Sequence, residues 1–171
     1  MLPATSETKT KVADQPRVLV VDDEPGLIEV IGDVVRQHVD CRIIAASTVA
    51  QARKILADGP IEVLVTDVHL PDGDGMSLLA ALREQQPNAS AIVITGSPSM
   101  DRAITAMRDG AIDFVSKPFS NQQLVDRVRS AIERHTTNMK RERRIDRLRQ
   151  AVKRLNDSRK LISKKVDLLC N

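Results

Sequence analysis

The sequence predicts an α/β fold, a doubly wound five-stranded parallel sheet with helices on both faces. Three observations predict it. Five short apolar runs rich in β-branched residues lie between residues 17 and 116. Segments of helical length and helical apolar period separate them. Continuous apolar runs are typical of strands buried on both faces, and their alternation with helices indicates parallel strands.

Each element follows from its own stretch of sequence. Strands are expected at residues 17–21, 43–46, 63–66, 91–95 and 112–116. Helices are expected around the apolar positions of 27–35, 50–56, 76–82, 100–107 and 124–132. Pro25 at a helix start and Gly59 and Gly110 after helix ends are the usual boundary residues.

The composition excludes several classes of protein. The chain has 171 residues, of which 42% are hydrophobic and 29% charged, so it can bury a core. Aromatic residues make up 1%, which argues against a stacking platform for single-stranded nucleic acid. Cys41 and Cys170 are too few for a disulfide framework or a four-cysteine zinc site. No apolar run reaches the roughly 20 residues of a membrane span, and we expect a cytoplasmic protein.

The charge is divided unevenly along the chain. Residues 1–133 carry 13 basic and 19 acidic residues, whereas residues 134–171 carry 13 basic and four acidic ones. An acidic part followed by a basic part indicates two functional pieces. We therefore expect a disordered tail at 1–15, an α/β domain at 16–134 and a basic coiled-coil helix at 135–171.

Polar residues collect where the predicted strands end. Asp22 and Asp23 follow the first strand, Asp67 the third, Thr95 ends the fourth and Lys117 follows the fifth. Ligands of open parallel sheets bind at this edge. Crowded carboxylates favour a hard cation such as Mg²⁺, and an ammonium and a hydroxyl suit phosphoryl oxygens. The set predicts attack by a carboxylate on a phosphoryl donor, giving an aspartyl phosphate.

Simpler interpretations exist for parts of this pattern. An isolated pair of aspartates is usually a solvated turn or a helix cap. Asp72 and Asp74 are interpreted in that way, as turn and N-cap residues. The prediction of a site depends on five groups that each stand at the end of a core strand.

The same residues carry a resemblance to a known family. Residues 17–134 resemble the receiver domain of two-component response regulators. The matching motifs are Val-Leu-Val-Val-Asp-Asp-Glu, Val-Thr-Asp-Val-His-Leu-Pro-Asp-Gly-Asp-Gly, Val-Ile-Thr-Gly and Phe-Val-Ser-Lys-Pro-Phe. The resemblance implies the strand order 2-1-3-4-5, a sensor histidine kinase or phosphotransfer protein as partner, and no enzymatic turnover beyond self-phosphorylation and slow autodephosphorylation.

The resemblance also implies a role for each site residue. Asp67 would accept the phosphoryl group. Asp22, Asp23, Asp67 and the main-chain carbonyl of His69 would hold Mg²⁺, and Thr95 and Lys117 would contact the phosphoryl group. The resemblance further implies that Phe114 is the switch aromatic, that the Lys117–Pro118 bond is cis, and that His69 and Ser97 tune the phosphoryl lifetime.

The C-terminal segment predicts a long helix. No proline or glycine occurs from 121 to 171, although residues 135–138 are weaker helix formers that suggest a joint. A heptad follows, with Ile145, Leu148, Val152, Leu155, Arg159, Ile162, Val166 and Leu169 at alternating a and d positions. β-branched residues at a and leucine at d favour a parallel two-stranded coiled coil. Arg159 at an a position would reduce stability and could fix the register.

Alternatives to this interpretation stay open. The helix could instead fold back on its own α/β domain. The basic run Lys140-Arg141-Glu142-Arg143-Arg144 could contact DNA. The chain could be a phosphatase or transferase with an aspartate nucleophile, or a dimerisation module that works without phosphate. The chain could also be part of a longer regulator.

Overall fold

The computed structural model describes residues 15–169, and the surroundings of side chains up to residue 165. The tail predicted at 1–15 therefore lies outside the described residues, except for Gln15. The chain divides into two compact units, one ending at His135 and the other beginning at Thr136.

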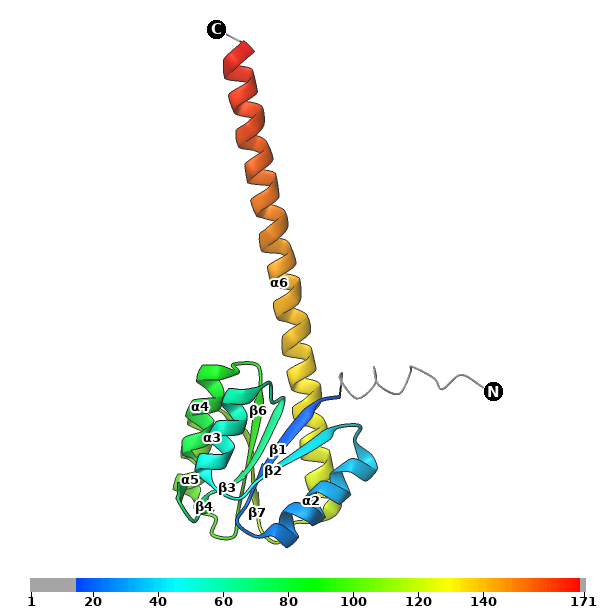
Figure 1. The fold of residues 1–171 in the computed structure, drawn as a ribbon, viewed down its shortest axis with the longest axis vertical. Helices are drawn as coiled ribbons and strands as arrows, with labels where there is room; N and C mark the ends of the chain where they lie inside the picture. The colour runs from blue at the N-terminus through cyan, green and yellow to red at the C-terminus, as the bar shows by residue number, and fades with distance from the viewer. Residues whose placement is uncertain (1–14, 170–171) are drawn as a thin grey trace, which may run out of the picture. The chain divides into compact units, whose positions relative to one another are not determined.

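The first unit contains the predicted parallel sheet (Figure 1). Its strands are β1 (Arg17–Val21), β2 (Arg42–Ala46), β3 (Val63–Asp67), β6 (Ser90–Thr95) and β7 (Ala111–Ser116). They are hydrogen-bonded in the order β2-β1-β3-β6-β7, and every neighbouring pair is parallel. Numbered within this sheet alone, the order is 2-1-3-4-5, so the predicted fold class is confirmed.

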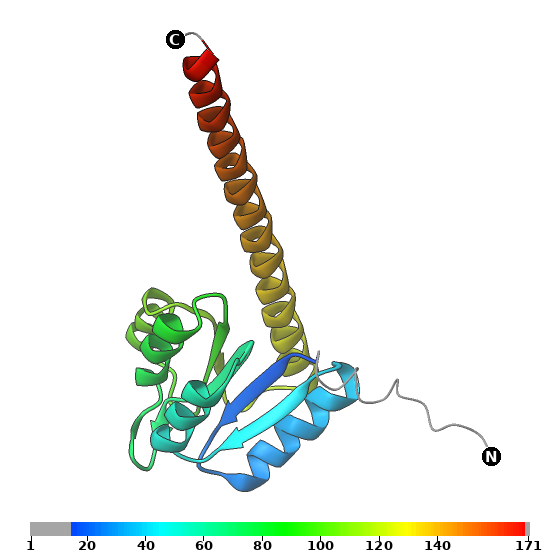
Figure 2. The same cartoon turned by 45° about the horizontal axis from the view of Figure 1, so that its top comes forward.

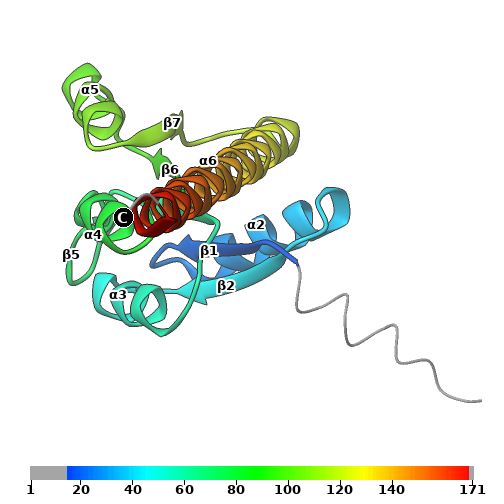
Figure 3. The ribbon, with the colours of Figure 1, turned by 90° about the horizontal axis from the view of Figure 1, so that it is seen from above.

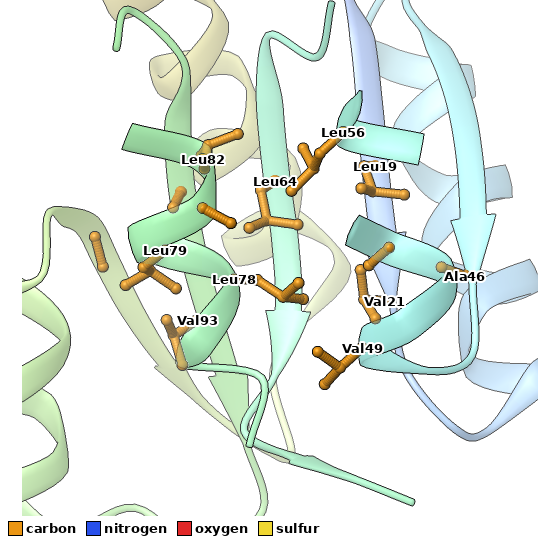
Figure 4. Packing of buried hydrophobic residues seen from close by; sticks show 14 of the residues in the cluster. Leu19, Val21, Ala46, Val49, Leu56, Leu64, Leu78, Leu79, Leu82 and Val93 are labelled. Carbon is orange, nitrogen blue, oxygen red and sulfur yellow. The ribbon is translucent and has the colours of Figure 1, made fainter. Parts of the chain in front are cut away.

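Helices cover both faces of the sheet, as the views in Figures 2 and 3 show. They are α2 (Pro25–His38), α3 (Val49–Asp58), α4 (Ser77–Gln85), α5 (Met100–Arg108) and α6 (Asn121–Leu169). On one face, α3 and α4 place Leu56, Leu78 and Leu82 against the sheet residue Leu64 (Figure 4). On the other face, α2 and the start of α6 pack against alternate residues of the same strands. Burial of apolar surface on both sides explains why these strands are apolar at consecutive positions.

The register brings the strand ends to one edge. Val21 of β1 pairs with Thr66 of β3, and Asp67 pairs with Ile94 of β6. Thr95 in turn pairs with Ser116 of β7. The residues that follow these positions therefore emerge together, as the sequence analysis expects.

A short two-stranded ladder, β4 (His69–Leu70) with β5 (Gly73–Asp74), occupies the turn after β3. The carboxylate of Asp72 accepts hydrogen bonds from the main-chain N–H groups of Val49 and Ala50, at 2.7 and 2.9 Å. Asp74 accepts one from the N–H of Met76 at 2.8 Å. Asp74 is thus a turn residue and not an N-cap, since the N-cap of α4 is Met76. Asp72 does cap a helix, but this helix is α3 rather than the one that follows it.

Helix α6 is continuous from Asn121 to Leu169. Leu124, Val128 and Ala131 are buried in the core of the first unit. The helix does not break at residues 135–138, although the division between the two units falls there. No helix in the described part of the chain is long and apolar enough to cross a bilayer.

Candidate functional site

Three carboxylates gather at the C-terminal edge of the sheet. Asp22 follows β1, and Asp67 is the last residue of β3. Asp22 and Asp67 are 2% and 7% exposed, whereas Asp23 is open to solvent. One ligand oxygen of each lies within 4.8 Å of the others. Burying carboxylates so close together is costly without positive charge nearby.

Lys117 supplies that charge from the end of β7. Its Nζ lies 2.8 Å from Oδ2 of Asp22 and 2.7 Å from Oδ2 of Asp67. Partial burial alone would lower the pKa of this ammonium, but the hydrogen bonds and charges of the two aspartates outweigh burial and raise its pKa above the ordinary value. Lys117 therefore stays protonated and bridges the two buried carboxylates.

Main-chain groups orient the other oxygen of each buried aspartate. The N–H of Glu24 donates to Oδ1 of Asp22 at 2.9 Å, and the N–H of His69 donates to Oδ1 of Asp67 at 3.0 Å. Each carboxylate is thus held by one fixed donor and one ammonium. This fixes the direction of the Asp67 oxygens toward the edge of the sheet.

Thr95 and Phe114 lie outside this hydrogen-bonded group. The Thr95 side chain is fully buried, and its hydroxyl oxygen accepts a hydrogen bond from the N–H of Ser97 at 3.2 Å. Its carbonyl accepts one from the N–H of Lys117 at 2.8 Å, which ties the two strand ends together. Phe114 is half-buried and packs against the core on the α3 and α4 side. The Lys117–Pro118 peptide bond is cis.

The donor set fits a hard divalent cation. All three clustered side chains offer carboxylate oxygens, and sulfur and imidazole ligands are absent from this described cluster. Oxygen-only sites that leave part of the coordination to water and phosphate suit Mg²⁺. The exposed position of Asp23 leaves the cluster open to solvent on one side.

Gly75 belongs to the site, although the sequence analysis did not single it out. A Cβ at this residue would overlap the main-chain carbonyl oxygen of Asp67 and lie 2.7 Å from Oγ1 of Thr66. Its N–H donates to the carbonyl of Val68 at 2.8 Å. The only signal in the sequence was the second glycine of Asp-Gly-Asp-Gly, which a turn alone would also explain.

Comparison with known proteins points to one family. The sequence model of the response regulator receiver domain matches residues 18–129. Over 123 residues the chain is 39% identical to the C4-dicarboxylate transport transcriptional regulatory protein DctD of Pseudomonas aeruginosa, covering 70% of this chain and 26% of DctD. Over 117 residues it is 36% identical to the response regulator protein PilR of the same organism, covering 68% of this chain and 26% of PilR.

Solved structures agree with the sequence comparisons. The beryllofluoride-activated NtrC4 receiver domain dimer is 34% identical, with a TM-score of 0.66, and the match covers 70% of this chain and 98% of that one. The receiver domain of the Francisella response regulator 1452 is 29% identical, with a TM-score of 0.64 and coverage of 70% and 98%. The chain spans about a quarter of the length of DctD and PilR, and the residues that match the family model lie within the first unit. This chain therefore belongs to the response regulator receiver domain family of two-component signalling proteins.

Proposed function

We propose that this chain receives a phosphoryl group on Asp67 from a sensor histidine kinase or a phosphotransfer protein and works in the cytoplasm. The observation that carries the proposal is the buried Asp67 carboxylate at the end of a central strand, 2.7 Å from the Lys117 ammonium. Membership of the receiver family supports the same conclusion. The match covers only 26% of DctD and of PilR, so the proposal concerns the receiver and not the whole activity of either protein.

Asp67, Lys117 and Thr95 have different roles in the proposed phosphoryl transfer. An Oδ atom of Asp67 attacks the phosphorus of the donor and forms the new P–O bond. The bond from phosphorus to the donor's leaving atom breaks, and that atom departs with the electron pair. Lys117 neutralises charge on the phosphoryl oxygens, and the Thr95 hydroxyl donates a hydrogen bond to one of them. Each chain reacts once, and slow hydrolysis of the acyl phosphate resets it.

Asp22, Asp23, Asp67 and the main-chain carbonyl of His69 would hold Mg²⁺. When bound, the ion neutralises negative charge on the carboxylates and the incoming phosphate. The Lys117 ammonium contacts an oxygen of Asp22 and an oxygen of Asp67 in the structure. These two carboxylates would therefore bind both the ammonium and the metal ion.

The signal would leave the site through the elements that adjoin it. Thr95 is the last residue of β6 and Phe114 lies on neighbouring β7, which leads into α6. A shift of the Thr95 hydroxyl toward the phosphoryl group would allow Phe114 to change its packing. Helix α6 continues into residues 136–169, through which we propose that two copies associate.

Intact mass tests the phosphoacceptor assignment. The full chain is incubated with Mg²⁺ and acetyl phosphate, and so are Asp67→Ala and the matched control Asp58→Ala, which changes an exposed aspartate at the end of α3. The proposal predicts a gain of one phosphoryl group in the wild type and in Asp58→Ala, and none in Asp67→Ala or with EDTA. An equal gain in Asp67→Ala would refute it.

A further inference from the structure

An apolar stripe runs along the second unit, and its side chains are exposed in the described part of the chain. It consists of Ile145, Leu148, Val152, Leu155 and Ile162. These side chains are between 39% and 71% exposed, although each stands at an a or d position of the heptad. A groove lies along its first half, lined by Ile145, Leu148 and Val152, with Arg149 and Asn156 among the residues that flank them.

We propose that this stripe pairs with the same stripe of a second copy in the antiparallel direction, with the two helices centred on Asp157. The inference rests on the proposed dimer and replaces the parallel direction that the a and d residues of the heptad favoured. The types of residue at a and d set the number of strands in parallel coiled coils, and they leave the direction to the flanking e and g positions. The charges at those positions are therefore decisive.

A parallel pairing brings like charges together. In that arrangement each g residue faces the e residue five positions later on the partner, so Arg144 faces Arg149 of the second copy, twice per dimer. The Arg149 guanidinium lies 3.4 Å from Asp146, but that pair is largely exposed and offsets little of the repulsion. At the centre, Arg159 would face Arg159 of the second copy across the apolar seam.

Nothing near Arg159 relieves that contact. The positions three and four residues away on its own helix are Leu155, Asn156, Ile162 and Ser163, none of which is acidic. Within the described residues, Arg159 makes no ion pair. Two guanidinium groups would thus meet where a parallel coiled coil excludes water.

The antiparallel pairing removes these contacts. Centred on Asp157, it places Arg159 beside Leu155 of the second copy instead of beside another arginine. Residues at e then face e, and residues at g face g. Arg149 comes opposite Ser163, Asn156 opposite Asn156, Ser158 opposite Ser158, and Lys165 opposite Ala151. Every charged flanking residue in this list meets a small or uncharged one, and apolar a and d positions still alternate along the seam.

Distances between spin labels distinguish the two directions in the full chain. Cys41→Ala and Cys170→Ser remove the native thiols, and single labels are attached after Asp157→Cys or Arg143→Cys, both at outward f positions. Residue 157 meets its counterpart in either direction, so its label reports only that a dimer forms. For residue 143, the antiparallel pairing separates the two labels by about 42 Å along the axis, from 28 residues at 1.5 Å each. A parallel pairing gives no axial separation.

The outcomes separate the inference from the dimer itself. A short distance at 157 with a long one at 143 supports the antiparallel pairing. Short distances at both positions overturn it and leave the dimer standing. No interlabel distance at 157 overturns the dimer and, with it, the inference.

A charge reversal checks the result without labels. Arg144→Glu would turn the repulsive parallel contact with Arg149 into an attractive one, whereas the antiparallel pairing does not bring residue 144 beside Arg149 of the second copy. Arg143→Glu is the matched control, because it makes the same change in net charge outside both interfaces. We expect sedimentation equilibrium to give the same dimer dissociation constant for the two variants. Tighter association of Arg144→Glu alone would contradict the proposal.

Discussion

Gly75 lies so close to the main-chain carbonyl of Asp67 that a Cβ at residue 75 would overlap its oxygen. The carbonyl is main chain and the turn is anchored by the hydrogen bond from the Gly75 N–H to Val68, so neither side can yield at low cost. The backbone at Asp67, the proposed phosphoacceptor, can thus take this path only because residue 75 on the following turn has no side chain.

Gly75→Ala should therefore damage both stability and the site. We expect the free energy of unfolding to fall by about 1–3 kcal/mol or more, the usual cost of overpacking a buried position. Gly26→Ala is the control, because nothing lies within 4 Å of a Cβ there. Urea unfolding measures both, and acetyl phosphate labelling should decline in Gly75→Ala only. Equal stability of the two variants would show that the turn adapts.

Lys117→Met should separate metal binding from phosphorylation. Loss of the ammonium leaves the buried carboxylates of Asp22 and Asp67 without their counter-charge. In EDTA we expect a loss of about 3–5 kcal/mol in unfolding free energy, as when one partner of a buried ion pair is removed. Calorimetric titration should show tighter Mg²⁺ binding, while phosphorylation is lost. Lys54→Met, on the exposed face of α3, is the control. Unchanged Mg²⁺ affinity in Lys117→Met would contradict the idea that Lys117 and the ion bind the same two carboxylates.

Asp72 makes the stability of the α3 start dependent on pH. Hydrogen bonds from the N–H groups of Ala50 and Val49 hold the pKa of its carboxyl below the ordinary value. A group with a lowered folded-state pKa stabilises the fold above its unfolded pKa, about 3.9 for aspartate, and loses this contribution as pH falls through the folded value.

Asp72→Asn tests that dependence. The variant should be less stable than the wild type at pH 7, and the difference should shrink as the pH falls below about 4. Urea unfolding across this range measures it, with Asp58→Asn as the control for an exposed aspartate. A difference that does not change with pH would mean that the Asp72 charge has no part in the cap.

Cys41 should be an unreactive thiol. It is buried in the described structure, and burial is the main cause that raises its pKa to about 11. In a Cys170→Ser background, an aromatic disulfide reagent should react with Cys41 at pH 8 only as fast as the protein opens. The rate should rise to that of a free thiol in denaturant. Rapid reaction with the native protein would show that the α2 side of the core opens readily.

The sequence predicted the sheet well because its pattern is local. Each strand is a continuous apolar run, and the alternation of these runs with helices predicts a parallel sheet. The strand order within that sheet was implied by the resemblance to the receiver family. The cluster of Asp22, Asp67 and Lys117 was also predictable, since the carboxyl ends of parallel strands share one edge. The roles assigned to Thr95, Phe114 and the His69 carbonyl, and the domain boundaries, stay predictions.

Features that depend on contacts between distant segments were not predictable. Asp72 caps a helix 22 residues earlier, which no local capping pattern reveals. The close approach of Gly75 to Asp67 depends on the path of the turn, which the short β4–β5 ladder determines. At residues 135–138, weak helix formers suggested a joint, yet α6 continues, because a few unfavourable propensities do not end a helix without a proline or glycine.

Reductive trapping tests the central claim most directly. After incubation with acetyl phosphate and Mg²⁺, borohydride converts an aspartyl phosphate to homoserine, and peptide mass mapping finds its position. Our account predicts homoserine at position 67 and at no other aspartate, with none formed in EDTA. Homoserine at position 22 or 23, or a phosphoryl group that resists borohydride and maps to His69, would contradict it.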